Sequence, residues 1–465
     1  MPVPALLKRL ADAVHDSPWH GKVYFVGGCV RDPLLGLPLS HDFDFMVEED
    51  AIGLAEFLKK GELKELALTT YTAFGTGALL SGAASLEFST KRSDSYDSDS
   101  RKPIIREASL LEDAERRDFT INALYLPLEN WEALFDKTQL KECYLDPTKL
   151  GLTDLNNRIL RTPRDPRLSF DEDPLRILRA VRFRQRFDLT YDPSIADAAK
   201  ELTPRLSIVS RERIADEITK TLIGTNPGVA LCDWDEFGIL EQISPDLAAM
   251  STCVMSPTSV GMTVLEHTAR LLDKLENKNS VVRIAALLHD IGKVPTKQVI
   301  DGKVRFPLHE SVGAEQSTKI LRSLRFPTKD TTRIHHLVKG HMRLHGLSDM
   351  GKRAARRLIH DFGDDLDLLL DLIEADRASY RDGKPDHNFQ TCKRAILEIR
   401  NQLSQPKFES PLSGEEIMQI TGLEPGQKLG ALKDKLTDAV IDGELEQGDK
   451  ERATELLKEW AAQDS

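Results

Sequence analysis

The sequence contains little cysteine. Only five cysteines occur among 465 residues, scattered and odd in number (Cys29, Cys143, Cys232, Cys253 and Cys392). This pattern excludes the disulfide framework of a small secreted protein and offers no cysteine spacing for a metal site. We therefore expect reduced thiols in a cytoplasmic protein.

Long apolar runs are also missing. No stretch approaches the length of a membrane span, and the N-terminal region lacks a signal-peptide core because charges interrupt it (Lys8, Arg9, Asp12 and Asp16). The composition, 40% hydrophobic and 30% charged, is that of a soluble globular protein. The length suffices for about three domains, and we expect no membrane partner.

An excess of positive charge is absent, since the formal net charge is −12. The total argues weakly against nucleic acid, but phosphate contacts need only a local basic face. Residues 158–186 hold nine arginines and four carboxylates, whereas residues 363–376 are acidic. The charges are segregated, so an RNA partner is not excluded.

The most informative stretch is residues 22–47. Val23–Val26 is a short apolar run that predicts a buried strand. Gly27 and Gly28 follow and allow a sharp turn and a close backbone approach to a ligand. A short helix over Val30–Leu35 would then gather backbone N–H groups at its start, where phosphate binds well.

A second strand, Asp42–Val47, carries two carboxylates. Asp42 and Asp44 alternate with Phe43 and Phe45, so the carboxylates lie on one face and the rings on the other. Two adjacent carboxylates repel each other unless a cation lies between them, and hard oxygen ligands suit magnesium. Taken alone, the pair is more typical of a solvated edge strand than of a site. Its place shortly after a strand, a Gly-Gly turn and a helix favours a functional site.

The segment Gly27–Asp32, of the form Gly-Gly-x-Val-Arg-Asp, resembles the head of the polymerase-β-type nucleotidyltransferases, and within them the class II (bacterial-type) tRNA nucleotidyltransferases, or CCA-adding enzymes. The resemblance implies that Gly27, Gly28 and Arg31 hold a triphosphate. It also implies that Asp42 and Asp44 bind Mg²⁺ as catalytic residues.

A third carboxylate is expected beside this pair in the superfamily. Residues 67–74 and 77–88 predict a hairpin, and Glu87 lies on its second strand. Glu87 is our candidate catalytic residue. The alternative is an exposed strand glutamate.

A second motif, Arg116 to Ala123, reads Arg-Arg-Asp-Phe-Thr-Ile-Asn-Ala. Arg117 and Asp118 could be an ordinary ion pair at a helix start. The motif closely resembles one in which arginine and aspartate contact the nucleotide and its ribose, and we favour that role.

A third motif begins at Asp173, a good helix N-cap, followed by Pro174. Arg176, Arg179 and Arg182 then recur every three residues on one face. The stretch could be merely a basic amphipathic helix. It resembles the base-selecting motif of the family, which implies that Asp173 and Arg176 read the base and that Arg179 and Arg182 bind nucleotide.

Hydrogen-bond chemistry supports a reading role for an aspartate and an arginine. A carboxylate accepts and a guanidinium donates. Cytosine and adenine both present an amine donor beside a ring-nitrogen acceptor, whereas uracil and guanine present a carbonyl beside a ring N–H. One Asp173–Arg176 pair can therefore accept C and A while rejecting U and G.

A different chemistry begins near residue 265. His289 and Asp290 end an apolar helix, with His267 upstream and Asp376 downstream. Imidazole and carboxylate together suit a divalent transition metal or Mg²⁺ that activates water for phosphoester hydrolysis. The pattern resembles an HD-type phosphohydrolase with these four side chains as metal ligands, and two more histidines are extra ligands or phosphate contacts (His309 and His341).

Together these features predict an α+β chain that begins with a small nucleotidyltransferase head, built of a mixed sheet and helices (1–150). The rest is expected to be mostly α-helical: a neck (151–256), an HD domain (257–385) and a tRNA-binding tail (386–465). The resemblance implies CCA addition to tRNA from CTP and ATP, and a metal-dependent phosphohydrolase activity in the HD domain. The resemblance also implies that members that add only CC are shortened in the interval Ser93–Ser100, where this chain is not. Two alternatives stay open: A addition beside a separate CC-adding enzyme, and an HD phosphohydrolase with an RNA-binding head. A poly(A) polymerase fits the head motif less well.

Overall fold

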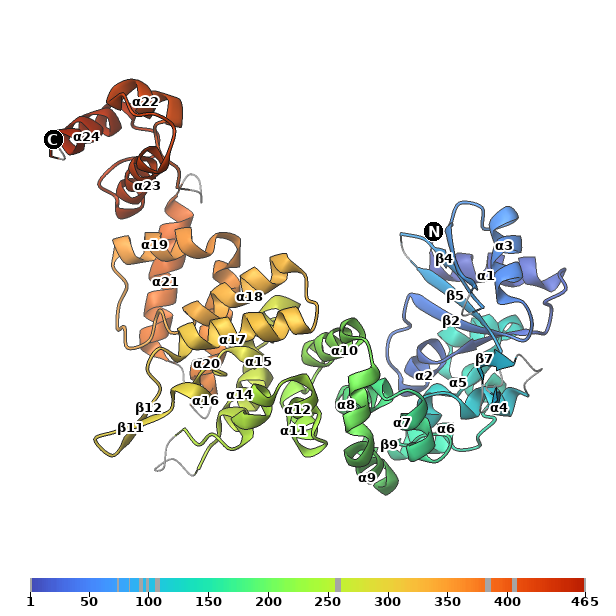
Figure 1. The fold of residues 1–465 in the computed structure, drawn as a ribbon. Helices are drawn as coiled ribbons and strands as arrows, with labels where there is room; N and C mark the ends of the chain where they lie inside the picture. Colours follow the sequence, from blue (N-terminus) through green and yellow to red (C-terminus); the bar gives the residue numbers. More distant parts are fainter. Residues whose placement is uncertain are drawn as a thin grey trace. The chain divides into compact units, whose positions relative to one another are not determined.

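The computed structural model describes residues 2–72, 75–82, 84–91, 95–97, 100–104, 109–255, 261–380, 386–403 and 408–463. The chain divides into two compact units, residues 1–209 and 210–465 (Figure 1). In the ranges given above, no helix has the length and apolar character needed to cross a membrane. The finer domain boundaries expected from the sequence stay predictions.

The first unit is built on a mixed six-stranded sheet, as predicted. Its strands lie in the order β3 (Ala67–Tyr71), β4 (Thr76–Leu80), β5 (Ser85–Thr90), β2 (Asp42–Val47), β1 (Val23–Val26) and β8 (Tyr125–Pro127). Strands β2 and β5 pair in parallel, and the other neighbours pair antiparallel. The single parallel pair lies in the middle of the sheet.

The hairpin expected from residues 67–88 is wrong in one respect. Residues 77–88 do not form one strand, because Ser81 turns the chain: its hydroxyl accepts from the Ala84 backbone N–H at 2.8 Å. The segment divides into β4 and β5, and β5 pairs with β2 as well as with β4. Glu87 therefore lies next to Asp44 on the neighbouring strand.

Helices cover the sheet. α1 (Val3–His15) buries the apolar stripe that its sequence spacing predicts (Leu6, Leu7, Leu10 and Val14). α2 (Gly28–Leu35) follows β1 and ends at Gly36, whose φ of 76° suits glycine. α3 (Ala51–Lys60) packs on β4 so closely that a Cβ on Gly77 would lie 2.7 Å from the Ala55 Cβ.

Aromatic rings fill the space beneath the central strands. The ring centroids of Phe25 and Phe45 are 4.7 Å apart, and those of Phe45 and Phe88 are 4.8 Å apart. Phe43 and Phe45 are each 1% exposed. This packing fixes the face of β2 that points to the core, so the opposite face must carry Asp42 and Asp44.

The remaining elements of the first unit are mostly short. β6 (Ser95–Asp97) and β7 (Ser100–Ile104) form a separate two-stranded sheet. After them come α4 (Leu110–Glu115), η2 (Thr120–Asn122), η3 (Leu128–Phe135), α5 (Lys137–Cys143), α6 (Gly151–Asn157), β9 (Ile159–Leu160), α7 (Pro166–Glu172), α8 (Leu175–Phe187), β10 (Thr190–Tyr191), α9 (Pro193–Leu202) and η4 (Thr203–Ile208).

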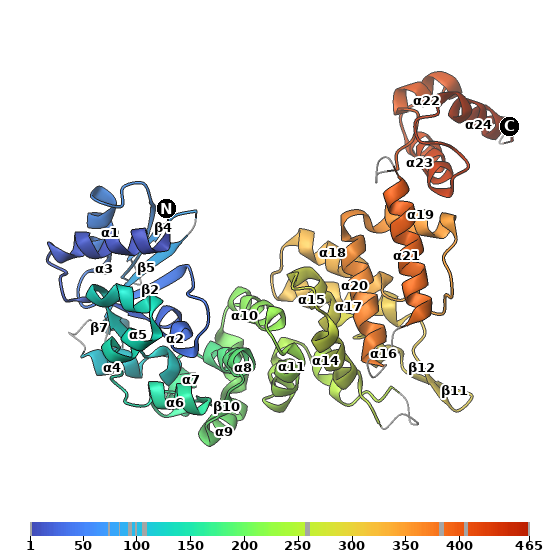
Figure 2. The ribbon, with the colours of Figure 1, turned by 180° about the vertical axis from the view of Figure 1, so that it is seen from behind.

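The second unit is almost wholly helical where it is described, as predicted (Figure 2). It begins with α10 (Arg211–Ile223), α11 (Pro227–Glu236), α12 (Ile239–Ile243), α13 (Pro245–Ala248) and η5 (Ala249–Ser251). The central group comprises α14 (Val264–Lys274), α15 (Ser280–Leu288), α16 (Lys293–Thr296), the hairpin β11 (Gln298–Ile300) and β12 (Lys303–Arg305), α17 (His309–Ser323) and α18 (Thr328–Gly340). The last elements are α19 (Lys352–Phe362), η6 (Gly363–Asp365), α20 (Leu366–Ser379), α21 (His387–Gln402), α22 (Gly414–Thr421), α23 (Gln427–Asp442) and α24 (Lys450–Gln463).

The stacked rings generate a stability prediction. Phe45→Ala removes a ring packed between Phe25 and Phe88, and we expect it to lower the free energy of unfolding by about 3–5 kcal/mol. The control is Phe57→Ala, since Phe57 is 40% exposed. Urea unfolding of the whole chain, followed by circular dichroism, measures both variants. An equal loss from the two would contradict this account of the core.

Candidate active sites

Three carboxylates share one face of the head sheet. Asp42 and Asp44 point away from the buried rings of β2, and Glu87 on β5 lies opposite Asp44 in the register. Loss of hydration raises the pKa of Asp44 to about 6, and the negative charges of Glu87 and Asp42 contribute. Crowded carboxylates of this kind fit a divalent cation, which would relieve their repulsion.

The glycine turn lies against this cluster. Gly27 has a φ of 75°, and a Cβ there would be 3.6 Å from the Asp44 Oδ2. The backbone at the start of α2 therefore approaches the carboxylates without an intervening side chain. The structure thus brings together the Gly-Gly motif and the aspartate pair that the sequence analysis associated.

Arg31 takes a different position from its glycine neighbours. It is 3% exposed, its Nε donates to Asp32 Oδ1 at 2.7 Å, and its Nη1 donates to Asn122 Oδ1. Its guanidinium also lies 4.4 Å from the centroid of the Phe187 ring. Arg31 therefore supports the turn from the interior, and its direct contact with a triphosphate stays a prediction.

Asp118 is the acceptor for several protein donors. Its Oδ2 accepts from Arg179 Nε at 2.9 Å, and its Oδ1 accepts from Asn122 Nδ2 at 2.9 Å and from the Phe119 backbone N–H at 2.8 Å. Burial alone would raise the pKa of Asp118, but Arg179 and these bonds lower it to about 2. Asp118 is therefore ionised and holds Arg179 in place.

Arg117 is held by groups that sequence reasoning missed. Its Nε donates to the Tyr125 hydroxyl at 2.8 Å, and its Nη2 donates to Asp113 Oδ2 at 3.0 Å. Tyr125 in turn donates to Asp113 Oδ2 at 2.7 Å. Asp113 was not predictable, because its burial depends on the contact between α4 and β8.

A cavity of about 370 Å³ joins the second and third motifs of the head. Its lining combines hydroxyls of the sheet with the polar side chains of the two later motifs (Thr76, Ser89, Thr90, Arg116, Arg117, Asp118, Asp173, Arg176 and Arg179). Ser89 lies two residues beyond Glu87 on β5, so the cavity and the carboxylates share a face. Arg182 does not line this cavity, and its guanidinium instead lies 4.5 Å from the Phe183 ring centroid.

The expected base-reading pair opens α8. Asp173 Oδ1 accepts from the Leu175 backbone N–H at 3.3 Å, as an N-cap does. Arg176 is held by two segments: its Nη1 donates to Ser169 Oγ at 2.8 Å and its Nη2 to the Arg116 carbonyl at 2.6 Å. Both side chains therefore face the cavity from one helix start.

The second unit contains a buried cluster of histidines and aspartates drawn from five places in the chain. His267 lies on α14, the adjacent His289 and Asp290 follow α15, His309 opens α17, His341 follows α18, and Asp376 lies on α20. The histidines and Asp290 are each at most 5% exposed. All six residues suggested by the sequence therefore converge.

Asp290 divides the cluster into two groups. Its Oδ2 lies 3.3 Å from His267 Nε2 and 3.1 Å from His289 Nε2, and Asp376 Oδ1 lies 3.0 Å from His267 Nε2. Its Oδ1 faces the other way, 3.4 Å from His309 Nε2 and 3.6 Å from His341 Nε2. Although it is buried, this Oδ1 has no hydrogen-bond partner.

The outer nitrogens of the four rings are already used. The Nδ1–H groups of His289, His309 and His341 donate to the carbonyls of Ala286, Phe306 and Val338 at 2.8, 2.9 and 2.6 Å. His267 Nδ1 lies 3.0 Å from the Ser379 hydroxyl, which donates to the Asp376 carbonyl. These bonds leave each Nε2 lone pair directed into the cluster, the arrangement that metal-binding imidazoles require.

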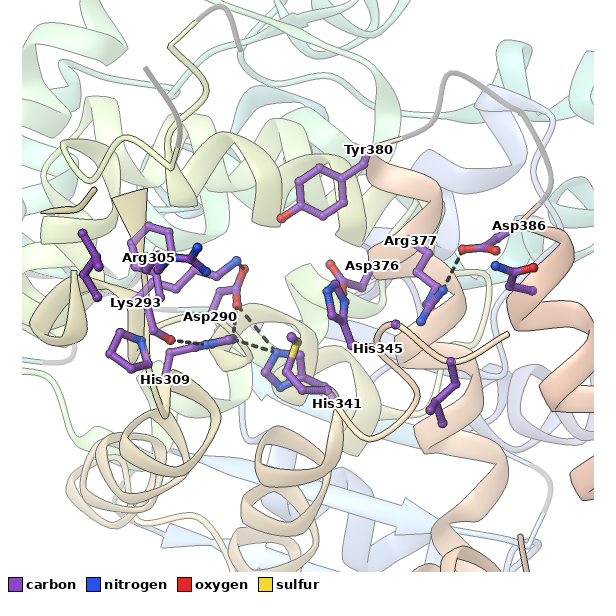
Figure 3. Close-up of a pocket in the computed structure, with 17 residues that line it drawn as sticks. Asp290, Lys293, Arg305, His309, His341, His345, Asp376, Arg377, Tyr380 and Asp386 are labelled. Carbon is purple, nitrogen blue, oxygen red and sulfur yellow. Dashed lines mark hydrogen bonds and ion pairs between the residues drawn. The ribbon is translucent and has the colours of Figure 1, made fainter. Parts of the chain in front are cut away.

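The cluster lies at the wall of a cavity of about 810 Å³ (Figure 3). Lys293, which the sequence analysis did not single out, reaches into it and places its Nζ 2.6 Å from Asp290 Oδ2. Burial alone would raise the pKa of Asp290, but His289 and Lys293 hold it well below its usual range. The site therefore presents an ionised carboxylate between two histidine pairs, a donor set that fits divalent metal.

Comparisons with known proteins identify the parts of the chain in which the two sites lie. Residues 23–161 match the poly A polymerase head domain, residues 188–250 match the probable RNA and SrmB-binding site of polymerase A, and residues 262–382 match the HD domain. The chain is 30% identical to the A-adding tRNA nucleotidyltransferase of Deinococcus radiodurans, over 76% of this chain and 80% of that protein. It is 28% identical to a CCA-adding enzyme of Limosilactobacillus reuteri, over 96% of this chain and 93% of that protein.

The fold agrees with a solved structure. The Bacillus stearothermophilus CCA-adding enzyme in complex with CTP superposes with a TM-score of 0.68 and 22% identity, over 100% of this chain and 99% of that one. Because this chain matches a head, an RNA-binding segment and an HD domain in succession, and is 30% identical to a tRNA nucleotidyltransferase over most of both chains, it belongs to the class II tRNA nucleotidyltransferases and carries an HD domain.

Proposed function

We propose that the head completes the 3′ end of tRNA by adding CCA from CTP and ATP. The observation that carries the proposal is that three carboxylates share one face of the sheet with Ser89, which lines the arginine-rich cavity. The tRNA 3′-hydroxyl would attack the α-phosphate of the nucleotide, and pyrophosphate would leave. This assignment agrees with the names of the relatives, which are tRNA nucleotidyltransferases.

The carboxylates Asp42, Asp44 and Glu87 would hold Mg²⁺. When bound, the cation would offset phosphate charge and favour the ionised form of the attacking hydroxyl. The protein groups then have separate parts. The backbone at Gly27 and Gly28 accommodates the triphosphate, and Arg179, fixed by Asp118, meets its remaining charge.

The pair at the start of α8 would choose the base. Asp173 accepts from the exocyclic amine of cytosine or adenine, and Arg176 donates to the adjacent ring nitrogen. Uracil and guanine would set acceptor against acceptor and donor against donor. Each such mismatch leaves a polar group unpaired at a cost of about 1–3 kcal/mol.

Relatives at similar identity add different ends. Besides the A-adding and CCA-adding proteins, the Thermus thermophilus CC-adding tRNA nucleotidyltransferase is 30% identical, over 94% of this chain and 93% of that protein. The unshortened sequence interval Ser93–Ser100 favours CCA or A addition over CC addition. We propose full CCA addition, and A addition beside a separate CC-adding enzyme is the alternative.

A second function is supported by the Asp290 cluster. We infer that the HD domain hydrolyses phosphoesters with divalent metal held by His267, His289, Asp290 and Asp376. The unpartnered Asp290 Oδ1 and the facing His309 and His341 offer ligands for a second cation. Lys293, at the cavity wall, would contact the substrate phosphate. The complete set of polar groups in the head argues against a chain that is chiefly an HD hydrolase.

The carboxylate assignment predicts that Asp42→Ala and Asp44→Ala each abolish nucleotide addition while tRNA binding is largely kept, because only the cation ligand is lost. Glu49→Ala is the matched control, since Glu49 is exposed and pairs with Lys22 at 3.3 Å. Incorporation of labelled CTP and a tRNA gel-shift measure the two properties. Near-normal addition by either aspartate variant at saturating Mg²⁺ would refute the catalytic assignment.

The base-reading assignment predicts altered nucleotide choice. Asp173→Ala should lower kcat/KM for CTP and ATP. It should also reduce the ratio of these values to kcat/KM for UTP by about ten- to hundredfold. Arg176→Ala should lower the use of both correct nucleotides. Relative kcat/KM for the four triphosphates is the measurement, with Asp171→Ala as control because Asp171 pairs with Arg205 at 2.9 Å. An equal loss with every nucleotide would mean that Asp173 positions substrate without reading it.

The two activities should be separable. The double variant His289→Ala, Asp290→Ala should lose metal content and metal-dependent hydrolysis of bis(p-nitrophenyl) phosphate, yet still add nucleotides to tRNA. Metal analysis of the purified protein provides a readout independent of activity, and His336→Ala, on the exposed side of α18, is the control. Loss of both activities in a folded double variant would show that the pair is structural or that the sites are coupled.

A further inference from the structure

Arg176 is held by an anchor that no motif of the sequence singles out. Its Nη1 donates to the hydroxyl of Ser169 at 2.8 Å and to the Ser169 carbonyl at 3.2 Å, while its Nη2 donates to the Arg116 carbonyl at 2.6 Å. A guanidinium has five N–H groups. Both Nη nitrogens are therefore engaged by the protein, which fixes the direction of the guanidinium group.

Ser169 also contacts the other member of the pair. Its carbonyl accepts from the Asp173 backbone N–H at 3.3 Å, as the last turn of α7 requires. The Ser169 side chain is fully buried, so no solvent molecule competes for its hydroxyl. One residue thus sets the position of the Asp173 backbone and the direction of the Arg176 fork.

A competing partner lies close to Arg176. Glu172 Oε2, which also pairs with Arg164, is 3.7 Å from Arg176 Nη1, beyond hydrogen-bond distance but within ion-pair distance. Arg176 is largely buried, so a donor that loses the Ser169 hydroxyl gains from finding another acceptor. Without that hydroxyl, the guanidinium would turn toward Glu172 and away from the base.

We propose that Ser169 is a positioning residue for base selection, and that its hydroxyl holds the Arg176 guanidinium away from Glu172 and toward the nucleotide base. The inference rests on the proposed base-reading role of Arg176. Ser169 itself does not line the head cavity. It orients the Arg176 guanidinium, whose remaining N–H groups must reach the ring nitrogen of the base.

The test compares Ser169→Ala with Ser169→Cys by single-nucleotide incorporation into tRNA. Ser169→Ala should reduce the ratio of kcat/KM for CTP to kcat/KM for UTP by about tenfold, because one hydrogen bond to a charged group is lost. Ser169→Cys should lose less, because the thiol fills the space and is a weak acceptor. Adding Glu172→Gln to Ser169→Ala should restore part of the CTP-to-UTP ratio, because the charge that competes for Arg176 is removed.

Control variants separate the role of Ser169 from the proposed base-reading role of Arg176. Ser317→Ala removes an equally buried hydroxyl in the second unit and should leave the CTP-to-UTP ratio unchanged. If Arg176→Ala does not change the ratio, the base-reading proposal is wrong. Suppose that Arg176→Ala lowers the CTP-to-UTP ratio of kcat/KM, whereas Ser169→Ala leaves both this ratio and the melting temperature unchanged. The proposed role of Ser169 is then wrong, and the base-reading role of Arg176 stands. A uniform loss with all nucleotides and no rescue by Glu172→Gln would also overturn it.

Discussion

The parallel pairing of β2 with β5 determines which side chains of the head can share a cation. In a parallel pair, facing residues keep the same side of the sheet along both strands, so Asp44 meets Glu87 and Phe45 meets Phe88. The stacked rings below prevent a one-residue slip, because such a slip would bury the carboxylates and expose the rings. Burial raises the pKa of Asp44, and the repulsion from Glu87, which the same register places beside it, adds to that rise.

Buried ionic groups support the polar residues around the head cavity. Asp113 holds Arg117, and Asp118 holds Arg179, each through a carboxylate with several donors. An arginine side chain fixed in this way loses little conformational entropy when a phosphate or a base binds, so less of the binding free energy is offset. The HD domain uses the same principle, since backbone carbonyls fix its imidazoles before any metal binds.

Local patterns predicted the parts of these sites that depend on period or on a turn. The alternation of Asp42 to Phe45 gave the correct face of β2, and Gly36 marked the end of α2. The division of residues 77–88 into two strands was missed because it depends on a side-chain turn at Ser81. Contacts between distant segments were also out of reach: nothing near Asn122 indicates that it joins Arg31 to Asp118, and nothing near Ser169 indicates that it faces Arg176.

The most direct measurement of the central claim uses the pure protein and a tRNA that lacks its last three nucleotides. Incubated with both CTP and ATP, this tRNA should be extended by C, C and A and then stop; with CTP alone it should gain two cytidines, and with UTP or GTP nothing. Extension only of a tRNA that already ends in CC, and only with ATP, would establish the A-adding alternative. No extension of either tRNA by a folded protein supplied with Mg²⁺ would contradict the account of the head as a nucleotidyltransferase site.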